Sequence, residues 1–270
     1  MIEKWEVTIP ELTGEEPRFA WIYLPESYEF EENRHYPVLY MFDGHNVFFD
    51  EESTYGKSWG MKEYMDFTET QLIIAAVECN HGADNERLSE YSPFDFETRS
   101  FGKPKVGSNA KRRGRIFIKG RGRQTMDWFC GSFKPYVDAA YRTIPDREHT
   151  FIAGSSMGGL MSLYAVLHYN EIFSRAAALS PSLWMNTEAS REMIESSAPA
   201  PDTVIYMDYG EKEWHNRERL LRAFGSMCTR LQKKNILLTA RMIPGGTHSE
   251  ASWEKQIPIF METLLYDLNR

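Results

Sequence analysis

The sequence predicts an α/β fold, in which a mainly parallel central sheet of about eight strands carries helices on both faces. Short apolar runs recur along the chain, and such runs are typical of strands buried on both faces of a parallel sheet. Segments with apolar residues at helical spacing lie between these runs. The 270 residues suit a single domain, with a basic insertion at about residues 100–123.

Each element is placed by its own pattern. Residues 5–9 and 19–24 alternate in polarity and predict an antiparallel opening pair joined by a Thr-Gly turn. Apolar runs predict further strands at 37–42, 72–77, 150–153, 176–179, 204–207 and 236–242. Helical spacing of apolar residues predicts helices over 129–140, 160–167 and 253–268.

Composition restricts the classes of function. The net charge of -8 argues against general nucleic-acid binding, and no apolar run reaches the roughly 18 residues of a membrane span. The opening residues do not resemble a secretory signal. The three cysteines, Cys79, Cys130 and Cys228, are few and widely spaced, which favours reduced thiols and a cytoplasmic location. Without a CxxC motif, the sequence predicts no metal site and no cofactor.

Residues 103–123 form a local exception, with nine Lys or Arg and no acidic residue. A solvated surface loop explains this stretch most simply. The alternative is a rim that attracts an anionic substrate or a partner subunit. The sequence leaves the oligomeric state open, with a homodimer as the commonest assembly.

The most informative segment surrounds Ser156. A short apolar strand runs into Gly154-Ser-Ser156-Met-Gly158, and an apolar helix follows. This is the context that a GxSxG nucleophile elbow requires, and only Ser156 lies at its centre. The two glycines allow the close backbone approach of a tight turn, and the N–H of Met157 can face an oxyanion. The alternative is a glycine-rich turn with a capping serine.

A nucleophilic serine needs a base, which in this chain order should come late. His168 belongs to the helix after Ser156, and His215 begins a charged helix. His248 lies in a loop between the last strand and the last helix, where this topology presents its base. We therefore predict His248 as the base.

The acid that orients the base should follow the strand at 204–207. Asp208, Glu211 and Glu213 all lie there, and spacing alone does not choose among them. Asp208, next to the strand, could instead be a buried structural group, and Glu211 could simply be solvated.

A second oxyanion donor is expected in the loop after the third strand. Gly44 lets the backbone come close there, so the N–H of His45 is predicted as the donor. A simple Asp-Gly turn is the alternative.

Three further residues are candidates for substrate binding. Arg87 could bind a substrate carboxylate or, as the favoured alternative, pair with Glu90 to brace its loop. Trp184 follows the sixth strand, and Trp214 follows the loop with the candidate acids. Either could line an acyl or aromatic pocket. Aromatic side chains more often serve packing alone.

Together these segments resemble the putative esterase family of α/β-hydrolases, which includes enterochelin esterases, esterase D, feruloyl esterases and mycolyltransferases. The likeness extends from about Tyr23 to Phe260. It is carried by the motifs YMFDG (40–44), RLSEYSP (87–93), YRT (141–143), AGSSMGGL (153–160), LSPSLW (179–184) and GGTH (245–248), with Trp253 beyond. In this family the acid often lies three residues after a glycine that ends the seventh strand. The resemblance therefore implies Glu213, three residues after Gly210.

The expected function is that of a serine carboxylic-ester hydrolase with a Ser156–His248–Glu213 triad and an acyl-enzyme intermediate. The expected substrate is a small, phenolic, sugar or siderophore ester. One alternative is an acyltransferase with the same triad, which product analysis with competing alcohols would distinguish. The other is a non-catalytic binding protein on the same fold, for which a fluorophosphonate probe would leave Ser156 unlabelled.

Overall fold

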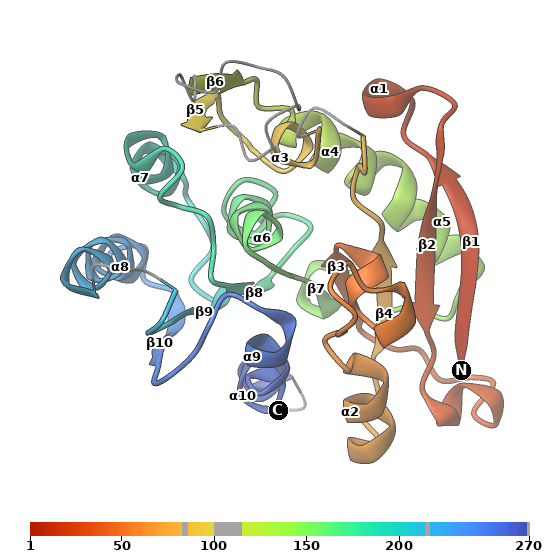
Figure 1. The fold of residues 1–270 in the computed structure, drawn as a ribbon. Coiled ribbons are helices and arrows are strands. Elements are labelled where there is room, and N and C mark those ends of the chain that lie inside the picture. The colour runs from red at the N-terminus through yellow and green to blue at the C-terminus, as the bar shows by residue number, and fades with distance from the viewer. Residues whose placement is uncertain (83–85, 100–114, 214–216, 269–270) are drawn as a thin grey trace.

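A computed structural model describes residues 1–82, 86–99, 115–213 and 217–268. An eight-stranded sheet runs through the molecule in the order β1-β2-β4-β3-β7-β8-β9-β10 (Figure 1). Strands β1 and β2 pair antiparallel, β2 pairs antiparallel with β4, and all other neighbours are parallel. The bounds are Ile2–Thr8 (β1), Pro17–Tyr23 (β2), Val38–Phe42 (β3), Ile73–Val77 (β4), Thr150–Ser155 (β7), Arg175–Leu179 (β8), Val204–Gly210 (β9) and Leu237–Ile243 (β10). The predicted fold class is confirmed.

Alternation along the central strands divides the apolar core into two layers. In β3, Tyr40 and Phe42 point to one layer, while Leu39 and Met41 point to the other. Burial on both faces explains why the central strands read as continuous apolar runs. One layer is closed by α4 (Gly122–Trp128), α5 (Lys134–Ala140), α6 (Met157–His168), α7 (Thr187–Ser196) and α8 (Arg217–Gln232). The other is closed by α2 (Met61–Thr68), α9 (Glu250–Glu254) and α10 (Ile257–Leu265), as Figure 1 shows.

Two predicted helices differ in detail. The helix expected over 129–140 continues from α4 through a π-helical turn at Phe129–Phe133 into α5. The helix expected over 253–268 is divided into α9 and α10 at Gln256. Pro258 lies in the first turn of α10, and a proline without an N–H is favoured at a helix start but not inside one.

The opening strands and the basic stretch contain elements that the sequence did not predict. A short helix, α1 (Pro10–Thr13), lies between β1 and β2 beside the expected Thr-Gly turn. Strands β5 (Phe96–Arg99) and β6 (Arg115–Ile118) form a separate antiparallel pair, so part of the basic stretch is a strand. Residues 100–114 lie outside the described residues. No helix of the described chain is long and apolar enough to cross a membrane.

The parallel strands all end at the same edge of the sheet. The loops that leave β3, β4, β7, β8, β9 and β10 therefore meet there, and ligands in open α/β sheets bind at this edge. These loops carry most of the residues that the sequence singled out.

Candidate active site

Ser156 occupies a strained turn between β7 and α6. Its backbone has φ 58° and ψ -117°, a conformation that L-residues rarely adopt and that costs on the order of 1–3 kcal/mol. A Cβ on Gly154 would lie 2.7 Å from the carbonyl carbon of Gly158, so the turn closes only with glycine there. The Ser156 N–H donates to the Leu179 carbonyl at 2.9 Å, which anchors the turn to β8.

His248 approaches Ser156 from the loop between β10 and α9. Its Nε2 lies 2.9 Å from the Ser156 Oγ. The indole of Trp253 meets the imidazole edge-on, with ring centroids 5.0 Å apart and planes at 81°. Such edge-to-face contacts restrict the ring and leave both nitrogens free for hydrogen bonds.

Glu213 holds the other side of the imidazole. Its Oε2 lies 2.8 Å from the His248 Nδ1, and its side chain is only 3% exposed. The second oxygen, Oε1, accepts hydrogen bonds from the Gly210 N–H and the Ser180 hydroxyl, both at 2.6 Å. Trp253 Nε1–H donates in turn to the Ser180 Oγ at 2.9 Å. The carboxylate is thus held in one orientation by partners from three loops.

Glycine at position 210 explains how the loop that carries Glu213 reaches the loop that carries His248. A Cβ there would lie 2.5 Å from the Gly246 carbonyl and 2.9 Å from the Glu213 Oε1. The Lys212 N–H also donates to the Gly246 carbonyl at 2.8 Å. The two loops are therefore in backbone contact, which fixes the distance between Glu213 and His248.

Asp208, the other acid that the sequence left open, points elsewhere. It is 1% exposed and accepts hydrogen bonds from the Tyr206 hydroxyl at 2.7 Å and the Ser180 N–H at 3.2 Å. Burial raises the pKa of its carboxyl to about 7. Of the other candidates, Glu211 accepts from the Gly245 N–H at 3.1 Å, and His168 contacts the Met193 carbonyl at 2.8 Å, away from Ser156. His215 lies outside the described residues.

The loop after β3 brings the second predicted oxyanion donor to the site. Gly44–Asn46 forms a single 3-10 turn, and Asp43 before it is left-handed, with φ 58°. A Cβ on Gly44 would lie 2.7 Å from the Trp21 ring, so glycine lets this turn pack against β2. Within the described chain, the backbone N–H groups of His45 and Met157 donate no hydrogen bond to the protein. Both groups are therefore available to a ligand.

Arg87 braces this loop, but through a partner that the sequence did not predict. Its guanidinium binds both carboxylate oxygens of Asp43, at 2.7 and 2.6 Å. Burial opposes ionisation of Asp43, but the adjacent Arg87 charge outweighs it and keeps the pKa of Asp43 below its usual value. The expected partner, Glu90, instead pairs with Arg18 at 2.5 Å. The predicted Arg87–Glu90 pair is thus wrong, because Asp43 turns its side chain toward Arg87.

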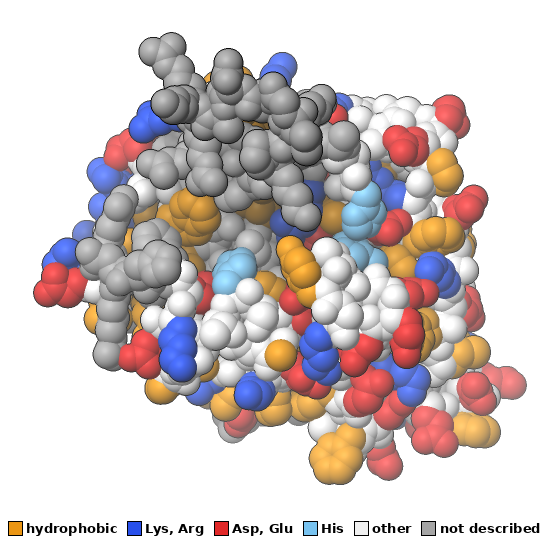
Figure 2. All heavy atoms as spheres, viewed as in Figure 1, with side chains coloured by type: hydrophobic (Ala, Val, Ile, Leu, Met, Phe, Trp, Pro, Cys, Tyr) orange, Lys and Arg blue, Asp and Glu red, His pale blue; other side chains and the backbone are white. Residues whose placement is uncertain are grey.

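These residues surround a cavity of about 300 Å³ with Ser156 and His248 on its wall. Histidine side chains reach the surface near the middle of the face shown in Figure 2. Arg87 lines the cavity, whereas Trp184 lies beside a separate apolar recess formed with Leu183 and Phe224. Trp214 lies outside the described residues. A larger cleft, of about 710 Å³, lies beside Tyr23 and Gln71 and does not include Ser156.

Three polar residues of the site were not identified from the sequence. Ser180 links the acid to Trp253, and Asp43 holds Arg87. Glu250, the first residue of α9, lines the cavity and is 6% exposed, and burial raises the pKa of its carboxyl. Glu250 follows His248 by two residues, which was the only signal that could have placed it near the base.

Comparison with known proteins finds a matching family. A family model described as putative esterase matches residues 12–266. The chain is 23% identical to the uncharacterized protein YbbA of Bacillus subtilis (strain 168) over 202 residues, which is 74% of this chain and 71% of that one.

Solved esterase structures share the fold. A ferulic acid esterase superimposes with a TM-score of 0.71 at 17% identity, covering 98% of this chain and 97% of the other. The enterobactin esterase FES of Shigella flexneri gives a TM-score of 0.71 at 17% identity, covering all of this chain and 60% of FES. The match over residues 12–266 shows that the chain belongs to the putative esterase family and is an esterase with the α/β-hydrolase fold.

Proposed function

We propose that this esterase is a serine carboxylic-ester hydrolase in which Ser156 is the nucleophile, His248 the base and Glu213 the acid. The observation that carries the proposal is the continuous chain of hydrogen bonds from Glu213 through His248 to Ser156, at 2.8 and 2.9 Å. A hydroxyl becomes a nucleophile when a neighbouring base accepts its proton in the transition state.

In the first step the Ser156 Oγ attacks the ester carbonyl carbon while its proton moves to the His248 Nε2. The imidazolium that forms lies against the carboxylate of Glu213, which is 3% exposed. Opposite charges interact more strongly there than in water. The tetrahedral intermediate then collapses, His248 protonates the departing alcohol, and an acyl-Ser156 remains.

In the second step water replaces the alcohol. His248 accepts a proton from the water as the water attacks the acyl carbonyl, and Ser156 leaves with that proton as the acid is released. In both steps the N–H groups of Met157 and His45 face the oxyanion. Each such donor contributes about 100- to 1000-fold to the rate in related chemistry.

The cavity supports a compact, polar substrate. Its volume of about 300 Å³ is at the small end for ligand sites, and its wall carries Arg87, Glu250 and two further histidines, His45 and His81. We therefore favour small, phenolic, sugar or siderophore esters over long-chain lipid esters. The names of the ferulic acid esterase and enterobactin esterase relatives are consistent with this range.

The test is hydrolysis of p-nitrophenyl esters by the wild type, Ser156→Ala and Ser155→Ala. We expect Ser156→Ala to lose at least about 1000-fold in kcat/KM. Ser155→Ala should stay within tenfold, because the hydroxyl that lies against the His248 Nε2 belongs to Ser156 and not to Ser155. Equal rates for the wild type and Ser156→Ala would refute the mechanism. A panel of acetyl, decanoyl, feruloyl and catecholate siderophore esters tests the substrate class, and a preference for decanoyl would contradict it.

A further inference from the structure

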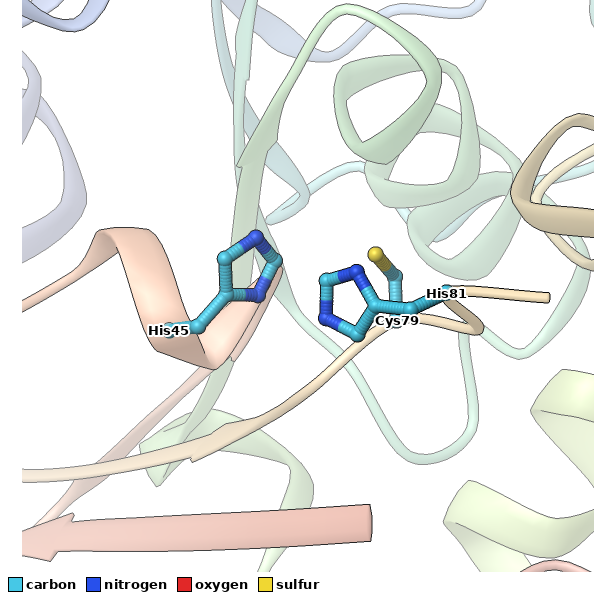
Figure 3. Close-up of side chains that lie close together, drawn as sticks. All are labelled: His45, Cys79 and His81. Atoms are coloured by element: carbon cyan, nitrogen blue, oxygen red, sulfur yellow. The ribbon is translucent and has the colours of Figure 1, made fainter. Parts of the chain in front are cut away.

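A cluster of metal-ligating side chains lies on the wall of the same cavity. His45 belongs to the turn after β3, and Cys79 and His81 follow β4. A ring nitrogen of each histidine and the Cys79 sulfur all lie within 4.8 Å of one another. Figure 3 shows the two imidazoles next to each other in an edge-to-face arrangement, with the sulfur beside the His81 ring. The sequence did not predict this site because its ligands come from two loops that become neighbours only in the folded sheet.

The hydrogen bonds of the two histidines leave the ligand atoms free. His45 is 6% exposed, and its Nε2 contacts the Thr54 Oγ1 at 3.0 Å. Its Nδ1 is buried and has no hydrogen-bond partner among the described residues. A buried polar atom without a partner is uncommon, and an absent ion is one of its ordinary explanations. The orphaned Nδ1 thus points independently to a ligand.

His81 shows the arrangement expected of a metal-binding histidine. Its Nε2 lies 2.9 Å from the Glu78 Oε1, which leaves Nδ1 as the ligand atom. Histidines that bind metals commonly donate the other ring N–H to a carboxylate, which fixes the tautomer and the ring orientation. Glu78 itself accepts a hydrogen bond from the Phe19 N–H at 2.9 Å, so this outer partner is held in place.

We propose that His45, Cys79 and His81 bind one thiophilic divalent metal ion, with Zn²⁺ as the best match. Two imidazoles and a thiolate are typical zinc ligands, at about 2.0–2.1 Å for nitrogen and 2.3 Å for sulfur. Tetrahedral coordination would bring the ligand atoms to about 3.5 Å from one another. Atoms that now lie up to 4.8 Å apart would therefore move closer by at most about 1.3 Å on binding. The ion displaces the Cys79 thiol proton to solvent, and its fourth position opens into the cavity.

Metal binding at this site would be linked to the proposed hydrolysis. His45 is both a ligand here and the proposed source of an oxyanion N–H, and the open coordination position shares the cavity with Ser156. We expect Zn²⁺ to inhibit ester hydrolysis reversibly, by occupying substrate space. This consequence rests on the proposed function, whereas metal binding itself does not.

The experiment measures metal binding directly on the chelator-treated full chain. Calorimetry with Zn²⁺ should give one site per chain, and Co²⁺ should show a thiolate-to-cobalt charge-transfer band. Cys79→Ser should abolish that band. His81→Ala should weaken Zn²⁺ binding by more than about 100-fold, because loss of an outer partner alone costs about 10- to 100-fold. Glu78→Gln should lie within that smaller range. The His81 side chain is 54% exposed, so His81→Ala should fold normally, as circular dichroism can check.

Matched control variants test whether Zn²⁺ binds to His45, Cys79 and His81 or to other cysteines and histidines of the chain. Cys228→Ser changes a half-buried thiol on α8 and should leave Zn²⁺ binding unchanged. His248→Ala removes the proposed base and should also retain binding. Any one of three results would overturn the proposal: no Zn²⁺ binding to the wild type, unchanged Zn²⁺ binding in Cys79→Ser and His81→Ala, or loss of Zn²⁺ binding in His248→Ala. A Ser156→Ala protein that still binds Zn²⁺ would support the metal site even if the hydrolase proposal failed.

Discussion

Replacing Glu213 by Gln should disable the base without disturbing the fold. Oε1 accepts from the Gly210 N–H and the Ser180 hydroxyl, so the amide oxygen of Gln should take that position. The amide NH₂ would then face the His248 Nδ1, where a carboxylate oxygen now lies at 2.8 Å. Because two donors repel, His248 would carry its proton on Nε2 and donate to Ser156 instead of accepting from it.

The magnitude follows from the role of the acid. A triad with the wrong histidine tautomer loses about 10⁴-fold in kcat, which corresponds to about 5.5 kcal/mol. Asp208→Asn is the matched control, since Asp208 contacts Tyr206 and Ser180 but not His248. We expect this variant to stay within about tenfold of the wild type. Burial already raises the pKa of Asp208 to about 7, so a neutral amide should be tolerated there.

The assay is kcat/KM for p-nitrophenyl acetate at pH 8, with circular dichroism to verify folding. A 10⁴-fold loss in Glu213→Gln with near-normal Asp208→Asn would support the assignment. The reverse pattern, with Asp208→Asn inactive and Glu213→Gln active, would refute it and make Asp208 the acid.

Three further predictions concern the scaffold of the site. Gly154→Ala would place a Cβ 2.7 Å from the Gly158 carbonyl carbon, so the turn at Ser156 must shift. We expect kcat/KM to fall by about 100-fold. An unchanged rate would contradict the close contact between the Gly154 and Gly158 backbones. Arg87→Gln should lower the free energy of unfolding, measured with urea at pH 8, by about 2 kcal/mol. This loss is smaller than for a fully buried ion pair, because the Arg87 side chain is 30% exposed. The loss should begin to shrink as the pH falls below about 4, the usual pKa of an aspartate, and should disappear as the pH passes the lower pKa that Asp43 has in the folded protein. A pH-independent loss would count against the ion pair. Since burial raises the pKa of Glu250, Glu250→Gln should stabilise the fold more at pH 8 than at pH 4, and the opposite order would contradict a buried charge.

Much of the fold could be predicted because its signals are local. Strands buried on both faces read as apolar runs, and the GxSxG segment between β7 and α6 requires glycine for steric reasons that act over a few residues. Helix boundaries were harder. The break at Gln256 depends on Pro258, whose effect could be read from the sequence, but the sequence pattern did not predict the π-helical turn at Phe129–Phe133.

The contacts between loops could not be predicted from sequence spacing. Arg87 could reach either Glu90 or Asp43, and the choice depends on the left-handed backbone of Asp43. Likewise, Asp208 and Glu213 were equivalent on spacing, and they differ in the structure because Gly210 lets the loop that carries Glu213 turn toward Gly246. Such contacts join residues far apart in the chain, and only the folded sheet brings them together.

Activation of Ser156 by His248 is the basis of the proposed mechanism, and labelling with a fluorophosphonate probe measures this activation on the serine itself. Peptide mass spectrometry of the treated wild type should find one adduct per chain, on Ser156. His248→Ala should label far more slowly, and Ser156→Ala should not label at all. An adduct on another serine, or equal labelling rates in the wild type and His248→Ala, would contradict the account.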